Sequence, residues 1–279
     1  MATFILSAGG MVGSVHPIER LRYVARASGA DQALLVRETA GALAAFRGDP
    51  AGLVTACRRI VTRHPASGPL WWLCARVLTA PDAMAEAWRA ADELDDDPTT
   101  AALAQALPED ATVCVLGWPD RVGGALRRRG DLDVLVIDVL GEGSGLVRHL
   151  ERSRVEAVDV AVSGLGGAAS SAQLVVLDAT AVGPAAALAV SGSRAAAAVA
   201  RHAGVPVWMV VGTGRLLPRR MYDCLAARLD AAADPWDNDD DVVPLDLVDC
   251  LVGPGGPETA VDGLRRTDCP VAPELLRGI

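Results

Sequence analysis

A change of sequence rhythm near Thr112 constrains the fold more than any other feature of this chain. From there onward, short apolar segments with strand character alternate with segments whose apolar residues have helical spacing. The strand segments read TVCVLG, DVLVIDV, VDVAVS, LVVLD, VWMVVG and LVDCLV. Because these strands are apolar on both faces and helical segments such as RVGGALRRR lie between them, they predict a parallel sheet covered by helices on both sides.

In the first part of the chain, apolar residues repeat at the spacing typical of helices. Between His16 and about Leu107, apolar residues recur at spacings of three and four, and Gly, Pro and Asp separate the periodic segments. These segments read PIERLRYVARA, QALLVRETAGALAAF, AGLVTACRRIVTR, GPLWWLCARVL and DAMAEAWRAADEL. We therefore expect an N-terminal helical domain over residues 1–108, followed over residues 109–279 by a Rossmann-like α/β domain with about five or six parallel strands.

The charge balance excludes several classes of protein. Acidic residues outnumber basic ones by 35 to 26, and the net charge is −9, so the chain lacks the clustered cations that bind nucleic acid directly. Every basic residue other than histidine is an arginine, which excludes mechanisms that need a Schiff-base or P-loop lysine. The N-terminus lacks the positively charged start of a signal peptide, and no segment has the ~18 strongly apolar residues of a membrane span. We expect a cytoplasmic protein that does not bind membranes.

Cysteines, histidines and acidic residues form no recognisable metal or cofactor motif. The cysteines have no CxxC spacing, so we expect reduced and mostly buried thiols at Cys57, Cys74, Cys114, Cys224, Cys250 and Cys269. The histidines form no ligand pair at helical spacing. The acidic run DPWDNDDD over residues 234–241 lacks the glycine and the terminal glutamate of a calcium loop, and we expect a solvated linker there. No metal and no cofactor are therefore expected.

The segment SGLGGAA has glycines at the spacing of a dinucleotide fingerprint, Gly164-x-Gly166-x-x-Ala169. The next strand begins near Leu174, which leaves no room for the ~30-residue strand-helix-strand unit that binds a dinucleotide. We therefore expect a tight glycine-rich connection at this place and no bound NAD.

Parallel α/β sheets bind ligands at the carboxyl ends of their strands. The residues that follow the predicted strands are Gly117 and Trp118, Asp138 to Gly145, Ser163 and Gly164, Asp178, and Gly212 and Thr213. Asp178 ends the apolar run LVVL, and it is either a working acid or only the polar cap of a strand end.

The start of the segment SRAAAAVARHAG gives a second kind of candidate. Small residues and one arginine open a predicted helix there, and free backbone N–H groups at a helix start can hold a phosphate or carboxylate. The residues are Ser191, Gly192, Ser193 and Arg194. The alternative is that Ser191 or Ser193 only caps the helix.

Several segments occur in the order found in one known superfamily. HPASGPLWWLCARVL resembles its segment Arg-Pro-Thr-x-x-x-Leu-x-x-Ala-x-x-x-x-Leu, and LVVLDATAV resembles its strand end Val-Gly-Ala-Asp-x-Val. SGSRAAAAVARHAGVPVWMVV resembles its run Ile-Gly-Thr-x-x-x-Ala-x-x-Ala-x-x-x-Gly-Ile-Pro-Phe-x-Val, and VVPLDLVDCLVGPGG resembles its closing Val-Pro-x-x-Leu-Val-Asp. The chain thus resembles the superfamily of the alpha, beta and delta regulatory subunits of eukaryotic translation initiation factor 2B, methylthioribose-1-phosphate isomerase and ribose-1,5-bisphosphate isomerase.

The resemblance implies which residues form the site. The isomerases of the family shift a sugar phosphate from aldose to ketose with a cysteine after the first strand and an aspartate after the fourth, positions that correspond to Gly117 and Asp178. Family positions on the phosphate side correspond to Ser28-Gly29-Ala30, to His64 in place of an arginine, and to the loop Gly141-Glu142-Gly143-Ser144-Gly145. The resulting candidates are Asp178 for catalysis and, for ligand binding, Gly29, His64, Gly117, Trp118, Gly143, Ser191, Gly192, Ser193 and Arg194.

Two functions of different classes follow from this resemblance. In the first, the protein resembles the initiation-factor subunits, is non-catalytic, and binds a nucleotide, a sugar phosphate or a protein partner in the cleft between its domains. In the second, it is a divergent aldose-ketose isomerase in which Asp178 is the acid/base and another residue replaces the cysteine. A pure scaffold is a third alternative. Family members pair through their α/β domains, which implies a homodimer.

Overall fold

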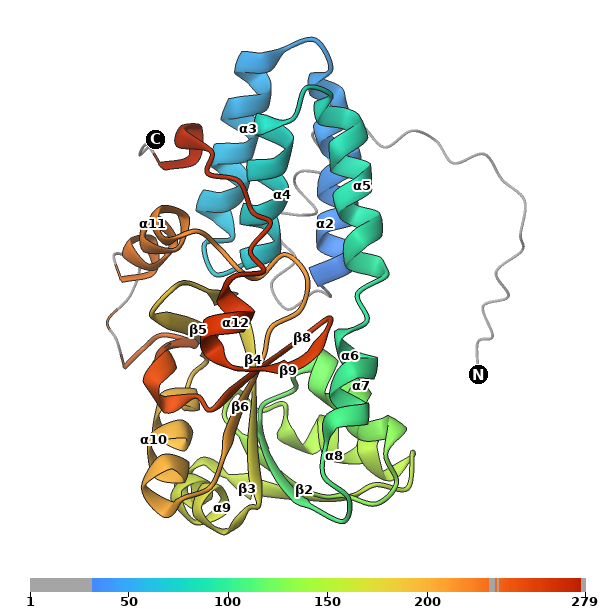
Figure 1. The fold of residues 1–279 in the computed structure, drawn as a ribbon, viewed down its shortest axis with the longest axis vertical. Coiled ribbons are helices and arrows are strands. Elements are labelled where there is room, and N and C mark those ends of the chain that lie inside the picture. Colours follow the sequence, from blue (N-terminus) through green and yellow to red (C-terminus); the bar gives the residue numbers. More distant parts are fainter. Residues whose placement is uncertain (1–31, 231–233, 235, 277–279) are drawn as a thin grey trace, which may run out of the picture.

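The structure, a computed structural model, describes residues 32–230, 234 and 236–276 of the chain. Helices make up the first part of the described chain, and a sheet flanked by helices makes up the second (Figure 1). In Figure 1 the first helices stand above the sheet, and the later helix α11 (Arg219–Asp230) lies beside them.

The helical part follows the punctuation of the sequence. It contains α2 (Gln32–Leu43), α3 (Pro50–Arg63), α4 (Gly68–Thr79), α5 (Ala83–Asp95) and α6 (Thr99–Ala106). Helices α3, α4 and α5 begin after Asp49, Ser67 and Asp82, whose side chains accept hydrogen bonds from backbone N–H groups of the first turn. Four of the predicted helical segments thus form α2 to α5, the segment PIERLRYVARA lies outside the described residues, and the short α6 is additional.

The sheet confirms the predicted α/β architecture. Its parallel strands run in the order β3-β2-β1-β4-β6-β8, and each of them corresponds to one of the predicted strand segments. They are β1 (Thr112–Leu116), β2 (Asp133–Asp138), β3 (Glu156–Ala161), β4 (Leu174–Val182), β6 (Val207–Val210) and β8 (Cys250–Gly253). A short β9 (Gly256–Glu258) adds an antiparallel strand at the edge beyond β8.

Helices connect the parallel strands, as the sequence predicts. They are α7 (Asp120–Arg128), α8 (Gly143–Glu151), α9 (Leu165–Ser171) and α10 (Ser193–Ala203), and α12 (Ala260–Leu264) follows the last strand. Helix α9 has 7 residues, so the glycine pattern of SGLGGAA lies in a short connection. A helix of this length does not complete the βαβ unit that binds a dinucleotide.

An antiparallel extension of the sheet was missed by the sequence prediction. It consists of β5 (Ala186–Val190), which pairs with β4, and β7 (Asp240–Pro244), which pairs with β5. Strand β5 reads AALAV, and because alanine is a poor strand former this segment gives no strand signal. The expectation of a solvated linker over residues 234–241 is wrong at its end, since β7 begins within that run. Asp178 is also not at a strand end, because β4 continues past it to Val182.

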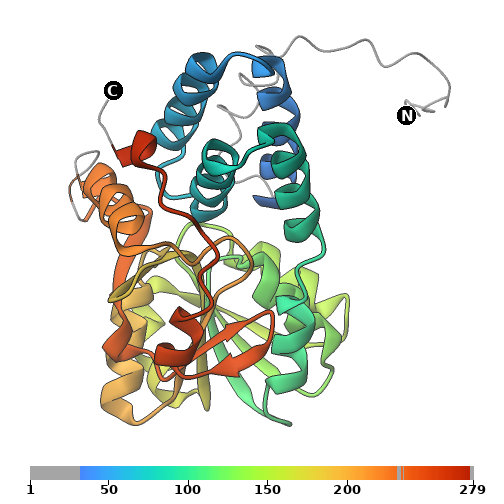
Figure 2. The ribbon, with the colours of Figure 1, turned by 45° about the horizontal axis from the view of Figure 1, so that its top comes forward.

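The core of the helical part uses side chains from both ends of the chain. Buried residues of α2 to α5 pack with Met221 and Leu225 of α11 and with Leu275 near the C-terminus. Figure 2 shows the red C-terminal segment running from the sheet up to the blue and teal helices. The boundary near residue 108 remains a prediction, since packing joins segments from either side of it.

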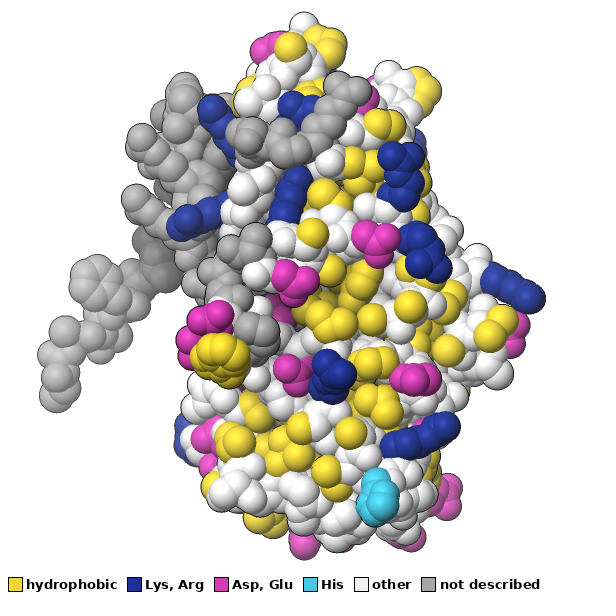
Figure 3. Space-filling model, turned by 90° about the vertical axis from the view of Figure 1, so that its left-hand side faces the viewer, with side chains coloured by type: hydrophobic (Ala, Val, Ile, Leu, Met, Phe, Trp, Pro, Cys, Tyr) yellow, Lys and Arg dark blue, Asp and Glu magenta, His cyan; other side chains and the backbone are white. Residues whose placement is uncertain are grey.

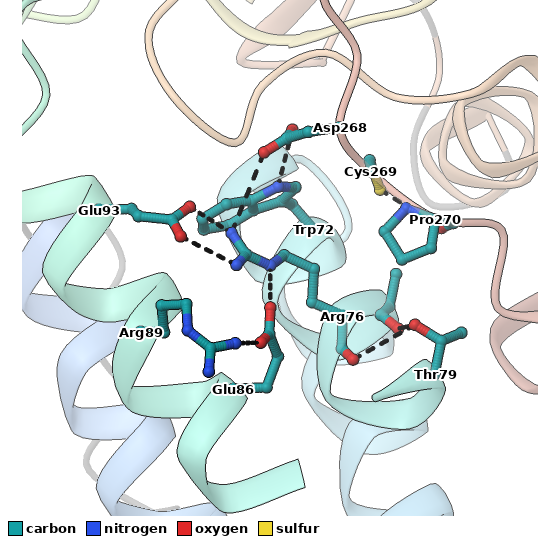
Figure 4. A network of polar contacts seen from close by, with 10 residues as sticks. Trp72, Arg76, Thr79, Glu86, Arg89, Glu93, Asp268, Cys269 and Pro270 are labelled. Carbon is teal, nitrogen blue, oxygen red and sulfur yellow. Dashed lines mark hydrogen bonds and ion pairs between the residues drawn. The ribbon is translucent and has the colours of Figure 1, made fainter. Parts of the chain in front are cut away.

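A polar network fastens the C-terminal segment to the helices (Figure 4). The guanidinium of Arg76 pairs with Glu86 and Glu93 of α5 and lies 4.5 Å over the ring of Trp72. The indole N–H of Trp72 donates a hydrogen bond to Asp268 at 3.0 Å. Burial opposes the charge of Arg76, but the hydrogen bonds to Glu93 and Glu86 outweigh burial and raise the pKa of Arg76 above its usual value. The network therefore holds a segment that follows the sheet against helices that precede it.

Candidate functional site

A cavity of about 510 Å³ lies at the carboxyl ends of the parallel strands, where sequence reasoning placed the ligand site. It is lined by the loops after β1 and β2, by the middle of β4, by the starts of α2, α10 and β7, and by the loop after β6. We call this cavity the cleft. Its lining residues are Gln32, Leu116, Trp118, Pro119, Asp120, Leu140, Glu142, Val176, Leu177, Asp178, Thr180, Val190, Ser193, Arg215, Asp239 and Asp240.

Asp178 lies in the cleft, and its partner is an arginine that the sequence analysis missed. The parallel ladder ends where Asp178 pairs with Val210 of β6, and the next residue, Ala179, pairs in antiparallel fashion with β5. Arg215 donates from Nη1 to Oδ1 of Asp178 at 2.8 Å and also to the carbonyl oxygen of Ala179. Asp178 is therefore one half of a buried ion pair and not the polar cap of a strand end, which excludes the simpler alternative.

Arg215 remains a cation inside the protein. It is 4% exposed, and burial lowers the pKa of its guanidinium to about 10, while the charge of Asp178 opposes that shift. Its Nε atom is buried and has no hydrogen-bond partner in the described structure. The rule for strand ends predicts Gly212 and Thr213 in the same loop, two positions before Arg215. The signal for Arg215 in the sequence is its place in the loop after the fifth strand.

Gly117 and Trp118 follow β1 as predicted, and the tryptophan lines the cleft. Gly117 has φ +61, a left-handed conformation that favours glycine, and it leaves no side chain at the family's cysteine position. Trp118 is 39% exposed, and its ring lies 5.4 Å from the ring of His149, centroid to centroid. Gly145 packs against the Trp118 ring, where a side chain would collide with it. Trp118 is thus held as an aromatic wall at the cleft.

The start of α10 contributes a buried hydroxyl to the cleft. Ser193 is fully buried, lines the cleft, and its Oγ has no hydrogen-bond partner in the described structure. The N-cap residue is Gly192, with φ +89, and no side chain caps the helix, so the alternative of a simple serine cap is wrong. The backbone N–H of Arg194 donates to Asp241 at 3.1 Å. A carboxylate of the chain itself therefore occupies part of the predicted anion site.

The other predicted site residues are not gathered in the cleft. His64 ends α3, Gly143 begins α8 with its N–H bonded to Asp138, and neither lines the cavity. Ser191, Gly192 and Arg194 are neighbours of Ser193 in the chain but do not line the cavity either. Gly29 lies outside the described residues. The structure thus unites Trp118, Asp178 and Ser193 from the predicted set.

The described lining of the cleft is acidic. Its one arginine, Arg215, is bound to Asp178, whereas the carboxylates are those of Asp120, Glu142, Asp178, Asp239 and Asp240. Burial, together with the charges of Asp239 and Asp241, raises the pKa of Asp240 to about 6. The site therefore carries an excess of negative charge at neutral pH.

Thiol chemistry has no support in the described cleft. None of the cysteines, all of which the structure describes, lines the cavity or forms a disulfide. Cys114 lies inside β1, and burial raises the pKa of its thiol to about 12. Most of the cysteines are buried, as expected. Because the reactive form is the thiolate, Cys114 is inert at neutral pH.

The described residues contain no group of three or more His, Cys, Asp or Glu side chains arranged to hold a metal ion. In the same part of the chain, no helix has the length and apolar character needed to cross a membrane.

The fold and this cleft define a class of protein: an α/β protein with a helical part placed over the carboxyl end of its sheet. Solved structures of translation initiation factor eIF-2B subunits share this fold. The eIF-2B structure from Pyrococcus horikoshii OT3 matches with a TM-score of 0.73 at 14% identity, covering 89% of this chain and 98% of that chain. The eIF2B beta structure from Chaetomium thermophilum matches with a TM-score of 0.70 at 17% identity, covering 92% of each chain.

A third match is the eIF-2B delta subunit from A. fulgidus, with a TM-score of 0.57 at 15% identity and coverage of 88% of each chain. No family model matches the sequence, and no curated protein matches it significantly. At these identities the structural matches confirm the fold that the sequence resemblance implied. The chain has the fold of these eIF2B subunits.

Proposed function

We propose that the protein is a non-catalytic, initiation-factor-2B-subunit-like protein of the cytoplasm that binds a small molecule in the cleft. The observation that carries this proposal is that two residues lining the cleft, Ser193 and Arg215, each have a buried polar atom, Oγ and Nε, without a partner in the described structure. A buried donor without a partner costs about 1–3 kcal/mol, and a bound ligand would remove that cost. We expect the ligand to form hydrogen bonds with these two atoms.

The same geometry argues against isomerase chemistry. Aldose-ketose isomerisation needs an acid and a base within hydrogen-bond reach of the reacting atoms. In the described cleft, Asp178 is already bound to Arg215, and no cysteine lines the cavity. The divergent isomerase remains the second candidate, because Asp178 does face the cleft.

A turnover assay separates these two candidates. The protein is incubated with methylthioribose 1-phosphate and with ribose 1,5-bisphosphate, and ketose formation is followed by NMR. We expect no ketose above the rate without protein. Turnover by the native chain that disappears in Asp178→Asn would establish the isomerase and end the non-catalytic proposal.

Binding in the cleft is tested separately. Sugars, nucleosides, amino alcohols and their phosphates are screened by ligand-observed NMR against the native chain and against Leu140→Trp, which puts a large side chain on the cleft wall. Leu34→Trp is the matched control, because Leu34 and Leu140 are both 45% exposed and Leu34 does not line the cleft. We expect binding that Leu140→Trp removes and Leu34→Trp keeps; a screen without a single cleft ligand would refute the proposal.

We include self-association through the α/β part in the proposal. Support comes from a Chaetomium thermophilum structure of similar fold, which is described as a tetrameric eIF2B-beta2-delta2 complex. In this chain β3 is an edge strand of the described sheet, and its Val158 is 58% exposed. Sedimentation velocity of the native chain and of Val158→Arg tests the idea. A native chain that is monomeric at high concentration would contradict it.

A further inference from the structure

The proposed cleft differs in charge from a site for sugar phosphates or nucleotides. Glu142, Asp239 and Asp240 line it, and no ion pair is formed by any of the three within the described chain. The only cation among the described lining residues, Arg215, is already neutralised by Asp178. An anionic ligand would bring further negative charge against these carboxylates, and a cation would relieve their mutual repulsion.

The face of the molecule in Figure 3 differs in charge distribution from the described lining of the cleft. On the uncovered face of the molecule in Figure 3, arginine and acidic side chains are interspersed, with apolar side chains between them. On this face arginines accompany the acids, whereas the described lining of the cleft has five carboxylates and one arginine, Arg215. The local arrangement calls for an explanation of its own.

The position that holds anions in many α/β proteins is partly occupied here by a carboxylate of the protein itself. The start of α10 offers backbone N–H groups to the cleft side, and the N–H of Arg194 donates to Oδ2 of Asp241. A phosphate at this place would have to displace the Asp241 carboxylate, which the chain itself keeps close to the helix start. The Asp241 carboxylate at the helix start therefore disfavours a phosphate there.

An aromatic wall completes the environment that ammonium groups prefer. Trp118 exposes part of its ring to the cleft, and Asp120 and Glu142 line the cleft beside it. A cation is attracted to the face of a tryptophan as well as to carboxylates, so ammonium groups bind where both meet. The exposed Leu140 adds an apolar surface, which suits a carbon-bearing cation better than a hydrated metal ion.

The unpartnered atoms define a second requirement of the ligand. Nε of Arg215 is a donor without an acceptor, and the hydroxyl of Ser193 can donate or accept. An oxygen atom of the ligand, such as a hydroxyl, can accept from Arg215 and can donate to or accept from Ser193. Resting on the proposed function, we propose that the cleft takes a hydroxyl-bearing organic cation, whose ammonium group faces Trp118 and the carboxylates and whose oxygen faces Arg215 and Ser193.

Ligands of matched shape and different charge test this proposal. One set is choline and its uncharged carbon isostere; the other is glucosamine, glucose and a glucose phosphate. Binding to the full chain at neutral pH is measured by calorimetry and ligand-observed NMR. We expect each cation to bind at least about tenfold more tightly than its neutral partner, a difference of about 1.4 kcal/mol, and the phosphate to bind most weakly.

Charge-removing variants show whether the preference comes from the cleft. In Glu142→Gln with Asp239→Asn, both on exposed side chains, the cation is expected to lose its advantage. The matched control is Asp133→Asn with Glu156→Gln, which removes as much charge at the starts of β2 and β3, the opposite end of the sheet. Equal loss in both variants would overturn the proposal, since it would trace the preference to net charge.

A probe that needs no ligand measures the same property. Leu140→Cys puts a thiol on the cleft wall, and its reaction rates with a trimethylammonium and a sulfonate methanethiosulfonate are compared, each relative to a free thiol. Leu34→Cys is the control for an equally exposed site, and the native chain corrects for its own cysteines. We expect the cationic reagent to be favoured about tenfold or more at Leu140→Cys only.

The outcomes separate the two proposals. Tighter binding of the neutral or phosphorylated probes, or an anion preference at Leu140→Cys, overturns the cationic ligand and leaves cleft binding intact. Failure of every probe and every compound of the wider screen overturns cleft binding, and the cationic ligand with it.

Discussion

Asp97 and Asp240 are both partly buried, yet the protein surrounds their carboxylates in opposite ways. The Asp97 carboxylate accepts hydrogen bonds from the N–H and hydroxyl of Thr99, from Nε of Arg121 and from the N–H of Thr213. Burial opposes the charge, but these partners outweigh it and lower the pKa of Asp97. Because its partners belong to α6, α7 and the loop after β6, Asp97 joins the helical part to the sheet.

Asp240 has neighbours that make its charge less favourable. Burial is the largest cause that raises the pKa of Asp240, and the negative charges of Asp239 and Asp241 raise it further, to about 6. No ion pair compensates it in the described chain. A compensated carboxylate stabilises the fold, whereas an uncompensated one costs stability and is expected where a ligand supplies the missing charge. The difference marks the Asp97 cluster as structural and supports the proposal that the cleft binds a ligand.

The largest expected effect tests the ion pair that lies in the cleft itself. Arg215→Met leaves Asp178 buried without a partner, and we expect it to lower the free energy of unfolding by about 3–5 kcal/mol. Urea unfolding at neutral pH measures this, with the exposed Arg220→Met as the control. Adding Asp178→Leu to Arg215→Met should recover much of the loss. A stable single variant would show that Asp178 is solvated and that the pair is not buried.

The next effect tests the structural side of the comparison. Asp97→Asn keeps the shape of the side chain but removes the charge that Arg121 and the N–H of Thr213 need, so we expect a loss of about 2–3 kcal/mol at neutral pH. The neighbouring Asp96→Asn, on an exposed side chain, should change stability by less than about 0.5 kcal/mol. Because the folded pKa of Asp97 is lowered, its stabilisation is present above the ordinary carboxyl pKa of 3.8 and is lost as the pH falls.

The sequence alone predicted the features that a local pattern of residues encodes, namely the parallel strands and the place of the cleft. The parallel strands were predictable because each is an apolar run between helical segments, and the cleft followed from the rule for strand ends. The loop after the fifth strand contains Arg215, but its pairing with Asp178 was not predictable, because the partners are 37 residues apart. The extension formed by β5 and β7 was missed because AALAV lacks strand formers and β7 begins inside an acidic run.

Asp240 is expected to show the opposite pH dependence to Asp97. Its folded pKa is raised from 3.8 to about 6, so the folded chain holds the proton more tightly than the unfolded chain. This contribution to stability is complete below pH 3.8 and is lost as the pH rises through about 6. Asp240→Asn should therefore be more stable than the native chain at neutral pH, by about 1–2 kcal/mol.

Urea unfolding of the native chain, Asp97→Asn and Asp240→Asn between about pH 4 and pH 8 compares the two carboxylates directly. The gap between Asp240→Asn and the native chain should widen from about pH 4 to about pH 6, the folded pKa of Asp240, and stay constant above it. Asp237→Asn, an exposed acid of the same run, should follow the native chain. Parallel curves for Asp240→Asn and the native chain would show that the Asp240 carboxylate is compensated after all, and the contrast with Asp97 would fail.

The smallest expected effect on stability is that of replacing Trp118. It tests whether this side chain contributes more to ligand binding than to the free energy of unfolding. Because 39% of the residue is exposed, Trp118→Ala should cost about 1 kcal/mol or less, while binding of a cationic probe such as choline should weaken about tenfold. Trp88→Ala is the matched control, since Trp88 is 42% exposed and does not line the cleft. A strong loss of stability in Trp118→Ala with unchanged binding would show that Trp118, like Asp97, has a structural role. The carboxylates alone would then have to account for any preference for cations.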